Sequence, residues 1–376
     1  MKKVLYVGKF VPNIGAAGIH VYNIAQCLNS QGVDVVYMAF RDSNAGSNEI
    51  IYDVSNLGRF KNLFDVCTGY YEFKIFKRVI ALEHPDAVIL YNKTNAFTRK
   101  AISYCKSHNI RIIIENTEWY TLAPINCGLA DFLLTRSVDR RIRCTDRCSD
   151  GVIAISSYLE QFYKGQGIRV FNLPPLFSYD LDKRKDSLNC DTIRFVYAGS
   201  PGGKDILKPF VKNISELRTS EGLNIEFHIY GINPIQLSDI MGNQDDYSKM
   251  GVFAHGRVSH DEVVDAVSQS HYTILLRYPE RYAKAGYSTK VAESLSLGTP
   301  VICNRIGGTD LDIENGTNGF VIPDTDDNNL KGIIRTVCNI EADKYSTIRK
   351  KCIEYASKRY SPDTYARNLL NFIFCQ

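Results

Sequence analysis

The residues from Gly286 to Pro300 combine hydroxyl groups, one lysine and one carboxylate, Glu293, in a pattern that suits phosphate binding. They read Gly-Tyr-Ser-Thr-Lys-Val-Ala-Glu-Ser-Leu-Ser-Leu-Gly-Thr-Pro, which predicts a loop leading into a short helix. The first turn of a helix offers unpaired backbone N–H groups and a positive dipole end. We therefore expect a nucleotide-linked substrate whose phosphates lie against Ser288, Thr289 and Lys290.

Length and composition describe a two-domain globular protein. Its 376 residues exceed what one hydrophobic core usually organises. The net charge of +4 is too small to indicate a nucleic-acid-binding protein, which would concentrate basic residues on one face. The 11 cysteines follow no repeating spacing, which favours reduced thiols in a cytoplasmic protein, and Cys127, Cys144 and Cys148 do not complete a metal-ligand set. No apolar stretch approaches the roughly 18 residues of a membrane-spanning helix, so we expect any membrane contact to be peripheral.

Short apolar segments alternate with helical patterns along the chain, which predicts parallel sheets covered on both faces. Paired prolines at 174 and 175, followed by the polar stretch 178–191, mark a linker. We expect one domain at 1–177, joined by a C-terminal helix at 361–376, and a second at 178–360. The expected strands are 4–7, 33–38, 87–91, 110–114 and 151–155 in the first half, and 194–199, 225–231, 252–253, 272–276, 301–302 and 320–322 in the second.

The ordered series of loops and elements resembles the retaining glycosyltransferases of the GT-B fold, family 4 (glycosyl transferases group 1), over nearly the whole chain. In the first half the resemblance rests on the glycine loop 15–18 and the segment 150–156. In the second half it rests on 197–205, 253–258 and 286–300, followed by the glycine pairs at 307–308 and 318–319. It implies an α/β protein with two Rossmann-like doubly wound domains facing a central cleft, the first on the acceptor side and the second binding the sugar donor.

The resemblance also implies roles for single residues. Lys204 would bind the donor phosphates and Glu293 would accept hydrogen bonds from the ribose, and these two are the catalytic candidates. Arg257 and Val258 would flank the base. The full set of donor-binding candidates is Gly15, Gly18, Ser200, Gly203, Tyr230, Arg257, Val258, Arg277, Tyr287, Ser288, Thr289 and Lys290, and the candidates for contacting the sugar or the acceptor are His20, Glu115 and Glu118.

The chemistry that this family resemblance implies places the catalytic load on cations and backbone dipoles, because neither a metal nor another cofactor is expected. No protein nucleophile stands out, which suits a front-face retaining mechanism in which the leaving phosphate helps to take the acceptor proton. Two positions depart from the family pattern. Counting back eight residues from Glu293 gives Ala285 where most members have a second glutamate, and Ser200 stands where an arginine usually follows the strand glycine. The resemblance therefore does not identify the sugar of the donor.

Basic residues gather in two segments of the first half. Arg136, Arg140, Arg143 and Arg147 are spaced four, three and four residues apart, which predicts one helical face. Residues 70–78 interleave aromatic and basic side chains, a composition that suits the headgroup region of an anionic bilayer. A lipid-linked acceptor at the inner face of the plasma membrane would account for both segments, and a solvated basic face is the alternative.

We interpret the chain as a cytoplasmic glycosyltransferase that moves a sugar from a nucleoside-diphosphate sugar to a saccharide or lipid-linked saccharide in the synthesis of a bacterial surface polysaccharide, such as a capsule, exopolysaccharide or O-antigen. Two alternatives are another GT-B nucleotide-sugar enzyme, such as a 2-epimerase, and a non-catalytic subunit that only binds the nucleotide sugar. A dinucleotide-dependent oxidoreductase is disfavoured, because the first loop has Gly8, Gly15 and Gly18 and lacks the Gly-x-Gly-x-x-Gly pattern.

Overall fold

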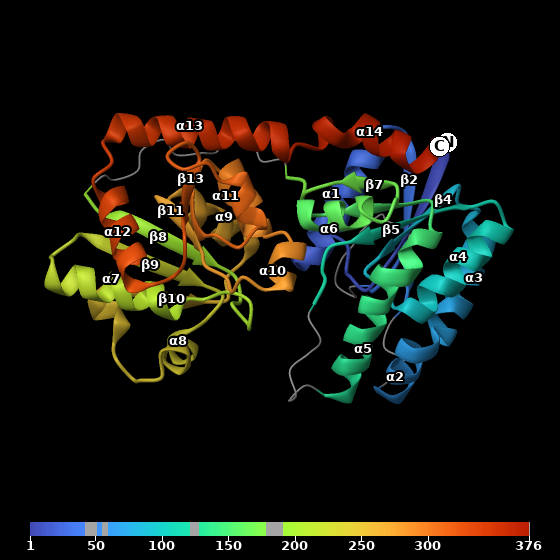
Figure 1. Cartoon of the computed structure of the whole chain (residues 1–376), viewed down its shortest axis with the longest axis horizontal. Coiled ribbons are helices and arrows are strands. Elements are labelled where there is room, and N and C mark those ends of the chain that lie inside the picture. Colours follow the sequence, from blue (N-terminus) through green and yellow to red (C-terminus); the bar gives the residue numbers. More distant parts are fainter. Residues whose placement is uncertain (42–50, 55–58, 121–127, 178–190, 376) are drawn as a thin grey trace. The chain divides into compact units, whose positions relative to one another are not determined.

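The chain forms two compact units (Figure 1), and the computed structural model describes residues 1–41, 51–54, 59–120, 128–177 and 191–375. Unit 1 comprises Met1–Leu176, Lys284–Tyr287 and Ser361–Gln376, and unit 2 comprises Phe177–Ala283 and Ser288–Tyr360. The sequence predicts a boundary after residue 177 and a return at 361. It gives no sign that the four residues 284–287 belong to unit 1.

Unit 1 is built on a seven-stranded parallel sheet with the strand order β3-β2-β1-β4-β5-β6-β7. All five residues of β4 are buried, as expected for a parallel strand covered on both faces. On β1, Leu5 and Val7 belong to one core cluster and Val4 and Tyr6 to another, so successive side chains enter two cores. The strands are β1 (Lys2–Val7), β2 (Val33–Ala39), β3 (Ile51–Asp53), β4 (Ala87–Tyr91), β5 (Arg111–Asn116), β6 (Gly151–Ala154) and β7 (Val170–Asn172).

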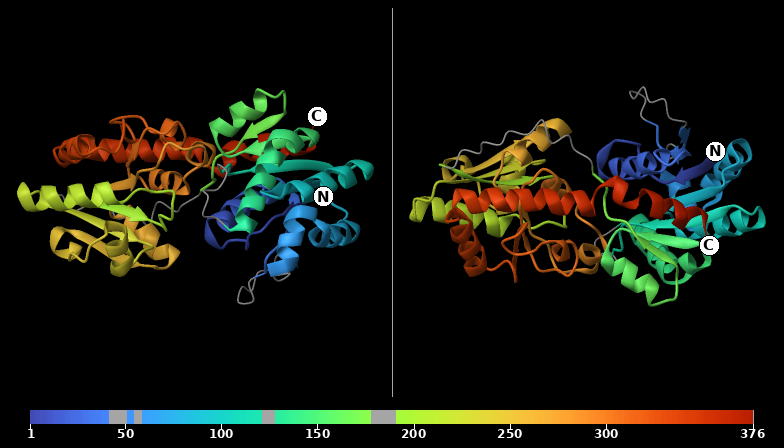
Figure 2. Two further views of the ribbon diagram at one scale, coloured as in Figure 1. Left: turned by 60° about the horizontal axis from the view of Figure 1, so that its bottom comes forward. Right: turned by 90° about the horizontal axis from the view of Figure 1, so that it is seen from above.

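Helices cover both faces of this sheet (Figure 2). One core cluster contains residues of α1 and α14, and the other contains residues of α3, α4 and α6. The C-terminal helix α14 thus joins unit 1 by packing against α1. The helices of unit 1 are α1 (Gly15–Asn29), α2 (Arg59–Thr68), α3 (Tyr70–Glu83), α4 (Asn95–Ser107), α5 (Leu129–Arg140), α6 (Ser157–Lys164) and α14 (Pro362–Phe374).

Unit 2 repeats the plan with a six-stranded parallel sheet in the order β10-β9-β8-β11-β12-β13. On β9, Ile225, Phe227 and Ile229 are buried, whereas the residues between them are half-buried, so one face of this strand is less covered. The two doubly wound sheets confirm the predicted fold class. The strands are β8 (Ile193–Ala198), β9 (Ile225–Tyr230), β10 (Val252–Gly256), β11 (Tyr272–Leu275), β12 (Val301–Asn304) and β13 (Gly319–Ile322); the helices are α7 (Lys208–Ser220), α8 (Pro234–Met241), α9 (His260–Ser268), α11 (Thr289–Ser296), α12 (Asp327–Cys338) and α13 (Ala342–Arg359), and α10 (Arg281–Ala285) crosses from unit 2 into unit 1.

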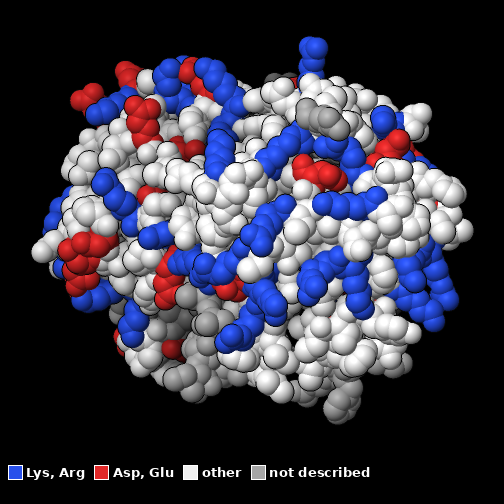
Figure 3. Space-filling model, turned by 45° about the vertical axis from the view of Figure 1, so that its right-hand side comes forward, with Lys and Arg blue, Asp and Glu red and all other residues white. Residues whose placement is uncertain are grey.

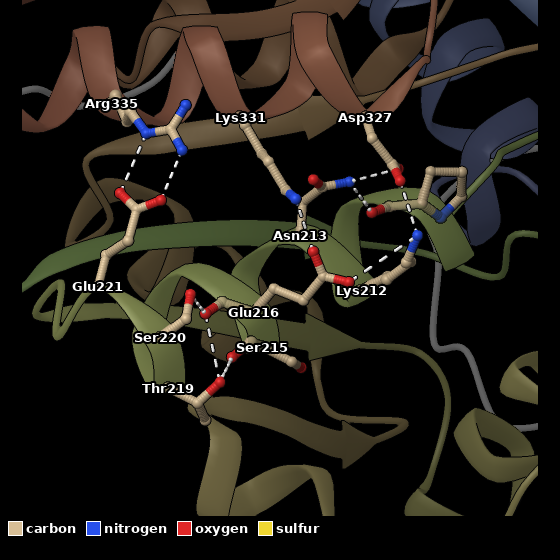
Figure 4. Close-up of polar contacts among 11 residues, drawn as sticks. Lys212, Asn213, Ser215, Glu216, Thr219, Ser220, Glu221, Asp327, Lys331 and Arg335 are labelled. Carbon is tan, nitrogen blue, oxygen red and sulfur yellow. Dashed lines mark hydrogen bonds and ion pairs between the residues drawn. The ribbon is translucent and has the colours of Figure 1, made fainter.

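A row of ion pairs joins α7 and the residue after it to α12 on the surface of unit 2 (Figure 4). Arg335 grips the carboxylate of Glu221 with two nitrogens, at 2.5 and 3.0 Å. Further along, Lys212 Nζ lies 2.6 Å from Asp327 Oδ2. These pairs are exposed, so water screens them and each contributes little to stability.

Two local predictions differ from the structure. Val170–Asn172, which lies outside the expected strands, forms β7, a short strand that pairs with β6. The four spaced arginines do not share one regular helix, because α5 ends at Arg140 and continues as the π-helical turn η1 (Arg141–Thr145) and the 3₁₀ turn η2 (Asp146–Cys148). The wider π turn shifts the angular phase of the residues that follow it.

Two absences concern only the described part of the chain. There, no helix combines the length and apolar character needed to cross a membrane. The same residues contain no group of three or more His, Cys, Asp or Glu side chains arranged to hold a metal ion, and Cys127, one of the cysteines weighed above, lies outside them.

Candidate active site

A buried cluster of charges lies just beyond the carboxyl ends of strands β8 and β11, where ligands bind in sheets of this kind. Asp205 Oδ1 lies 2.7 Å from Arg277 Nε. The second oxygen, Oδ2, lies 2.8 Å from Lys290 Nζ and accepts a 2.7 Å hydrogen bond from the Tyr197 hydroxyl. The side chain of Asp205 is only 1% exposed. Two predicted donor-binding residues, Arg277 and Lys290, are thus brought together by an acid that sequence reasoning missed.

Two cations, Arg277 and Lys290, and one carboxylate, Asp205, give this cluster a formal charge of one positive unit. Burial alone would raise the pKa of the Asp205 carboxyl, but the cations Lys290 and Arg277 outweigh burial and lower this pKa below its usual value. The carboxylate is therefore ionised at neutral pH and formally balances one of the two cations, while burial lowers the pKa of its partner Lys290 and the charge of Asp205 opposes this shift. Burial, followed by the charge of Asp205, raises the pKa of the Tyr197 hydroxyl, so Tyr197 stays a neutral hydrogen-bond donor.

Two glycines at the ends of β8 and β9 make room for the lysine. A Cβ atom at Gly199 would lie 2.6 Å from Cε of Lys290, so the lysine side chain passes directly over this glycine. A Cβ atom at Gly231 would lie 2.5 Å from the carbonyl oxygen of Gly199, and both residues have positive φ angles that disfavour other side chains. The position of Lys290 therefore depends on glycine at two neighbouring strand ends.

The start of α11 carries a hydroxyl group without a partner. Ser288, the N-cap residue, is 2% exposed, and its backbone N–H donates to Thr309 Oγ1 at 3.1 Å. Its own hydroxyl has no hydrogen-bond partner among the residues that the structure describes. A buried hydroxyl is costly when unpaired, so a ligand oxygen at this helix start would supply what the protein does not. Thr289 and Lys290 follow in the first turn.

The loop before Asp205 holds the predicted catalytic lysine. The backbone N–H groups of Lys204 and Asp205 both donate to the Pro201 carbonyl at 3.1 Å, and the Tyr282 hydroxyl donates to the Gly203 carbonyl at 3.2 Å. Lys204 is half-buried, directly next to the acid of the cluster, and Ser200, which precedes Pro201, is exposed. The role of Lys204 in binding phosphate stays a prediction.

The remaining predicted residues of unit 2 lie on α11 and near β10. Glu293, the other catalytic candidate, is half-buried one turn into α11, and its Oε1 lies 3.8 Å from Nε2 of His260, the first residue of α9. The ring of Tyr230 stacks on His255 with centroids 4.4 Å apart. Arg257 and Val258, which directly follow β10, are exposed and half-buried. The predicted ribose and base contacts are thus untested.

In unit 1 the structure joins two of the three predicted sugar or acceptor residues. His20 Nε2 lies 2.5 Å from Glu115 Oε1, and the other oxygen of Glu115 accepts a hydrogen bond from Tyr6. His20 and Glu115 are 4% and 1% exposed, so they form an interior pair in this structure. Glu118 is half-buried a few residues beyond β5. A role for these three in contacting sugar or acceptor stays a prediction.

The other predicted residues of unit 1 are Gly15, Gly18 and Tyr287, and each has a different structural setting. A Cβ at Gly18 would lie 1.9 Å from the Val11 carbonyl oxygen, so the loop backbone itself requires this glycine. Gly15 has a φ of +67° and nothing near its missing side chain. Tyr287 packs against the core cluster that contains Ala285, whose carbonyl accepts a 2.6 Å hydrogen bond from Ser156. Tyr287 therefore belongs to unit 1, although Ser288 belongs to unit 2.

Comparisons with known proteins agree with this arrangement. Residues 192–339 match the family model described as Glycosyl transferases group 1. An uncharacterized glycosyltransferase of Methanocaldococcus jannaschii is 24% identical over 350 residues, which are 90% of this chain and 89% of that protein.

Two solved structures share the whole fold. Anabaena Alr3699/HepE in complex with UDP and glucose has a TM-score of 0.68 and 14% identity, covering 99% of this chain and 99% of that one. WaaG, a glycosyltransferase involved in lipopolysaccharide biosynthesis, has a TM-score of 0.71 and 13% identity, covering 99% and 100%. The two parallel sheets with their flanking helices form a GT-B fold. The chain thus has the GT-B fold, and its second half resembles the glycosyl transferases of group 1.

Proposed function

We propose that the chain is a glycosyltransferase of the group 1 type, which binds the diphosphate of a nucleotide sugar at the Asp205 cluster and transfers the sugar with retention of configuration. The observation that carries this proposal is the pair of buried cations, Arg277 and Lys290, beside the unpartnered Ser288 hydroxyl at the start of α11. Cations, a hydroxyl donor and helix N–H groups are the groups that stabilise a departing diphosphate.

Asp205 would act as a positioning residue in this site. Its two oxygens hold Arg277 and Lys290 in place before a donor arrives, so little reorganisation is needed when charge develops on the leaving group. The cluster retains one formal net positive charge, and Lys204 on the adjacent loop would add a third cation. We expect these groups to act without a metal or another cofactor.

The surroundings of the Asp205 carboxylate are compatible with the proposed retaining mode. Both oxygens of Asp205 are engaged by cations and by Tyr197, so Asp205 is a poor candidate for a nucleophile. We propose front-face transfer, in which the bond from the anomeric carbon to the diphosphate breaks as the acceptor oxygen attacks, and the departing diphosphate takes the acceptor proton. Glu293 would bind the ribose, and Arg257 and Val258 would flank the base.

For the acceptor, we propose a saccharide or lipid-linked saccharide in the synthesis of a bacterial surface polysaccharide. Two observations support this setting: the fold is shared with WaaG, and Lys and Arg side chains spread over much of the surface shown in Figure 3. Such a surface suits peripheral contact with the anionic inner face of the plasma membrane, and we propose a cytoplasmic location on that side of it.

The donor is tested by thermal unfolding with a panel of nucleotide sugars, with UDP sugars first because the Anabaena structure contains UDP and glucose. A bound donor at a hundred times its dissociation constant should stabilise the protein by about 2.7 kcal/mol. Turnover is then measured as nucleotide release with membrane-lipid and saccharide acceptors, and as the anomeric configuration of the product.

Lys204→Ala is the decisive variant for the catalytic lysine. We expect unchanged unfolding and a loss of nucleotide release by at least about a hundredfold, typical for removal of one transition-state donor. Normal turnover in this variant would refute the role of Lys204. Donor binding without turnover by the wild-type protein would favour a non-catalytic subunit, and altered donor without a transfer product would favour a 2-epimerase.

A further inference from the structure

Unit 1 contains a cavity of about 520 Å³ between α2, α4 and the segment formed by α5 and η1. Three of the four spaced arginines line it, whereas Arg147, which lies in η2 beyond the π-helical turn, does not. A neighbouring cavity of about 370 Å³ shares Arg140 and Cys144 and adds Arg99. In the larger cavity, the side chains that matter for binding are those of Cys67, Asn95, Arg136, Arg140, Arg143 and Cys144.

The charge in the larger cavity is strongly positive. Its one lining carboxylate, Asp139, is engaged by Arg143 Nε at 2.9 Å and by the indole N–H of Trp119 at 2.8 Å. Arg136 lies over the ring of Phe132 at 5.5 Å. Within the described parts of the chain, neither Arg136 nor Arg140 forms an ion pair, so two guanidinium groups remain for a ligand.

The frame of the cavity is fixed by hydrogen bonds between helices. The backbone N–H of Asn95, at the start of the 13-residue helix α4, donates to Ser137 Oγ at 3.0 Å. The amide oxygen of Asn95 accepts a 2.6 Å hydrogen bond from Thr145. Asn95 and Ala96, at the start of α4, line the cavity together with the arginines, so the positive dipole end of this helix adds to the attraction for an anion.

We propose that this cavity binds a phosphate or diphosphate group, at a site separate from the donor cluster of unit 2. Guanidinium groups match the geometry of phosphate oxygens and pair with them through two hydrogen bonds. The group can come from a free phosphorylated compound or from a lipid headgroup, and both present the same oxygens. The proposal does not depend on the transferase function, since every residue that carries it lies in unit 1.

Cys144 allows a readout confined to this cavity. Its exposed thiol lines both cavities, whereas the exposed Cys375 lines neither and the buried Cys105 reports on folding. The experiment measures alkylation of each cysteine by iodoacetamide, by peptide mass spectrometry, with inorganic pyrophosphate or with sulfate at equal ionic strength. We expect pyrophosphate to slow alkylation of Cys144 by about tenfold or more relative to sulfate and to leave Cys375 unchanged.

The variants Arg136→Gln/Arg140→Gln and Arg147→Gln separate specific binding from general charge. Each rate is compared with and without pyrophosphate in the same variant, because loss of an arginine also changes thiol reactivity. The double variant should need at least about tenfold more pyrophosphate for equal protection, since charged hydrogen bonds are lost, and Arg147→Gln should behave as the wild type. If the double variant exposes Cys105, the single Arg140→Gln variant replaces it.

A third arm distinguishes the two sources of phosphate. Vesicles containing phosphatidic acid are compared with vesicles of phosphatidylcholine alone. Arginine-dependent protection of Cys144 by pyrophosphate supports a site for free phosphate compounds, and protection only by phosphatidic acid supports a headgroup site. The proposal fails if neither protects Cys144, or if protection is equal in the wild type and the Arg136→Gln/Arg140→Gln variant.

Discussion

Lys290 Nζ and Asp205 Oδ2 lie 2.8 Å apart within unit 2, although the residues stand 85 positions apart in the chain. Only the tertiary fold brings them together, since Asp205 follows β8 and Lys290 is the second residue of α11. The ion pair is therefore both a tertiary contact and part of the proposed phosphate site, and its removal should affect stability and activity together.

The first prediction concerns Asp205→Asn. This change leaves Arg277 and Lys290 close together without their counter-charge, so we expect a loss of about 3–5 kcal/mol in the free energy of unfolding. The matched control is Asp327→Asn, which breaks an exposed pair with Lys212 and should cost under about 1 kcal/mol. Denaturant unfolding measures the free energy of unfolding of both variants. Equal losses of stability would contradict the assignment of Asp205 as the buried counter-charge of Arg277 and Lys290.

The second prediction concerns pH. Because the folded protein lowers the pKa of Asp205, its carboxylate contributes stability that is fully present above the unfolded pKa of about 3.9 and is lost as pH falls toward the folded value. The stability gap between wild type and Asp205→Asn should therefore be constant from pH 7 to 5 and narrow below about pH 4. Urea midpoints across this range measure it. A gap that widens in acid would reverse the sign of the assignment.

The third prediction uses two serines of the same helical segment. Ser288→Ala removes a hydroxyl without a described partner, so we expect little change in stability but donor binding weaker by about tenfold. Ser294→Ala removes a buried hydroxyl that donates to Thr273 at 2.8 Å, so stability should fall by about 1 kcal/mol while donor affinity stays. Calorimetric titration measures the donor affinity of each variant, and thermal unfolding measures its stability. If Ser294→Ala weakened donor binding and Ser288→Ala did not, the donor phosphate would not bind at Ser288.

The fourth prediction tests the departure at Ala285. Ala285 is fully buried in a core cluster of unit 1, so Ala285→Glu forces a carboxylate into apolar surroundings. We expect a destabilisation of at least about 2 kcal/mol and no gain in turnover. Lys284→Glu, which introduces the same side chain at the half-buried neighbouring position, is the control. A stable Ala285→Glu variant with higher activity would show that this position faces the substrate.

Much of the fold was accessible from the sequence because its signals are local. The buried run 87–91 is apolar at every position, and Pro85 stands in the short loop before it. The strand β7 escaped prediction because three half-buried residues before a proline pair carry no alternating pattern. The π turn escaped for a similar reason, since regular spacing of arginines says nothing about a change of helical pitch.

The candidate site was accessible only in part. Hydroxyl residues before a helix indicate a phosphate site, and Lys290 and Arg277 were found as cations near it. Their common partner, Asp205, was missed because an acid next to a loop lysine has no periodicity, and its burial arises from strands far apart in sequence. One signal was available, since an acid between the phosphate lysine and an apolar segment needs a counter-charge once it is buried.

The assignment of residues 284–287 to unit 1 has a mechanical consequence. The chain passes between the units at 176/177, 283/284, 287/288 and 360/361, which makes four crossings where the predicted boundaries imply two. At the third crossing, a single peptide bond links Tyr287, packed on the core of unit 1, to Ser288, the cap of the helix that carries Lys290. The start of the proposed phosphate-binding helix is therefore tied by one peptide bond to a residue that packs on the core of unit 1.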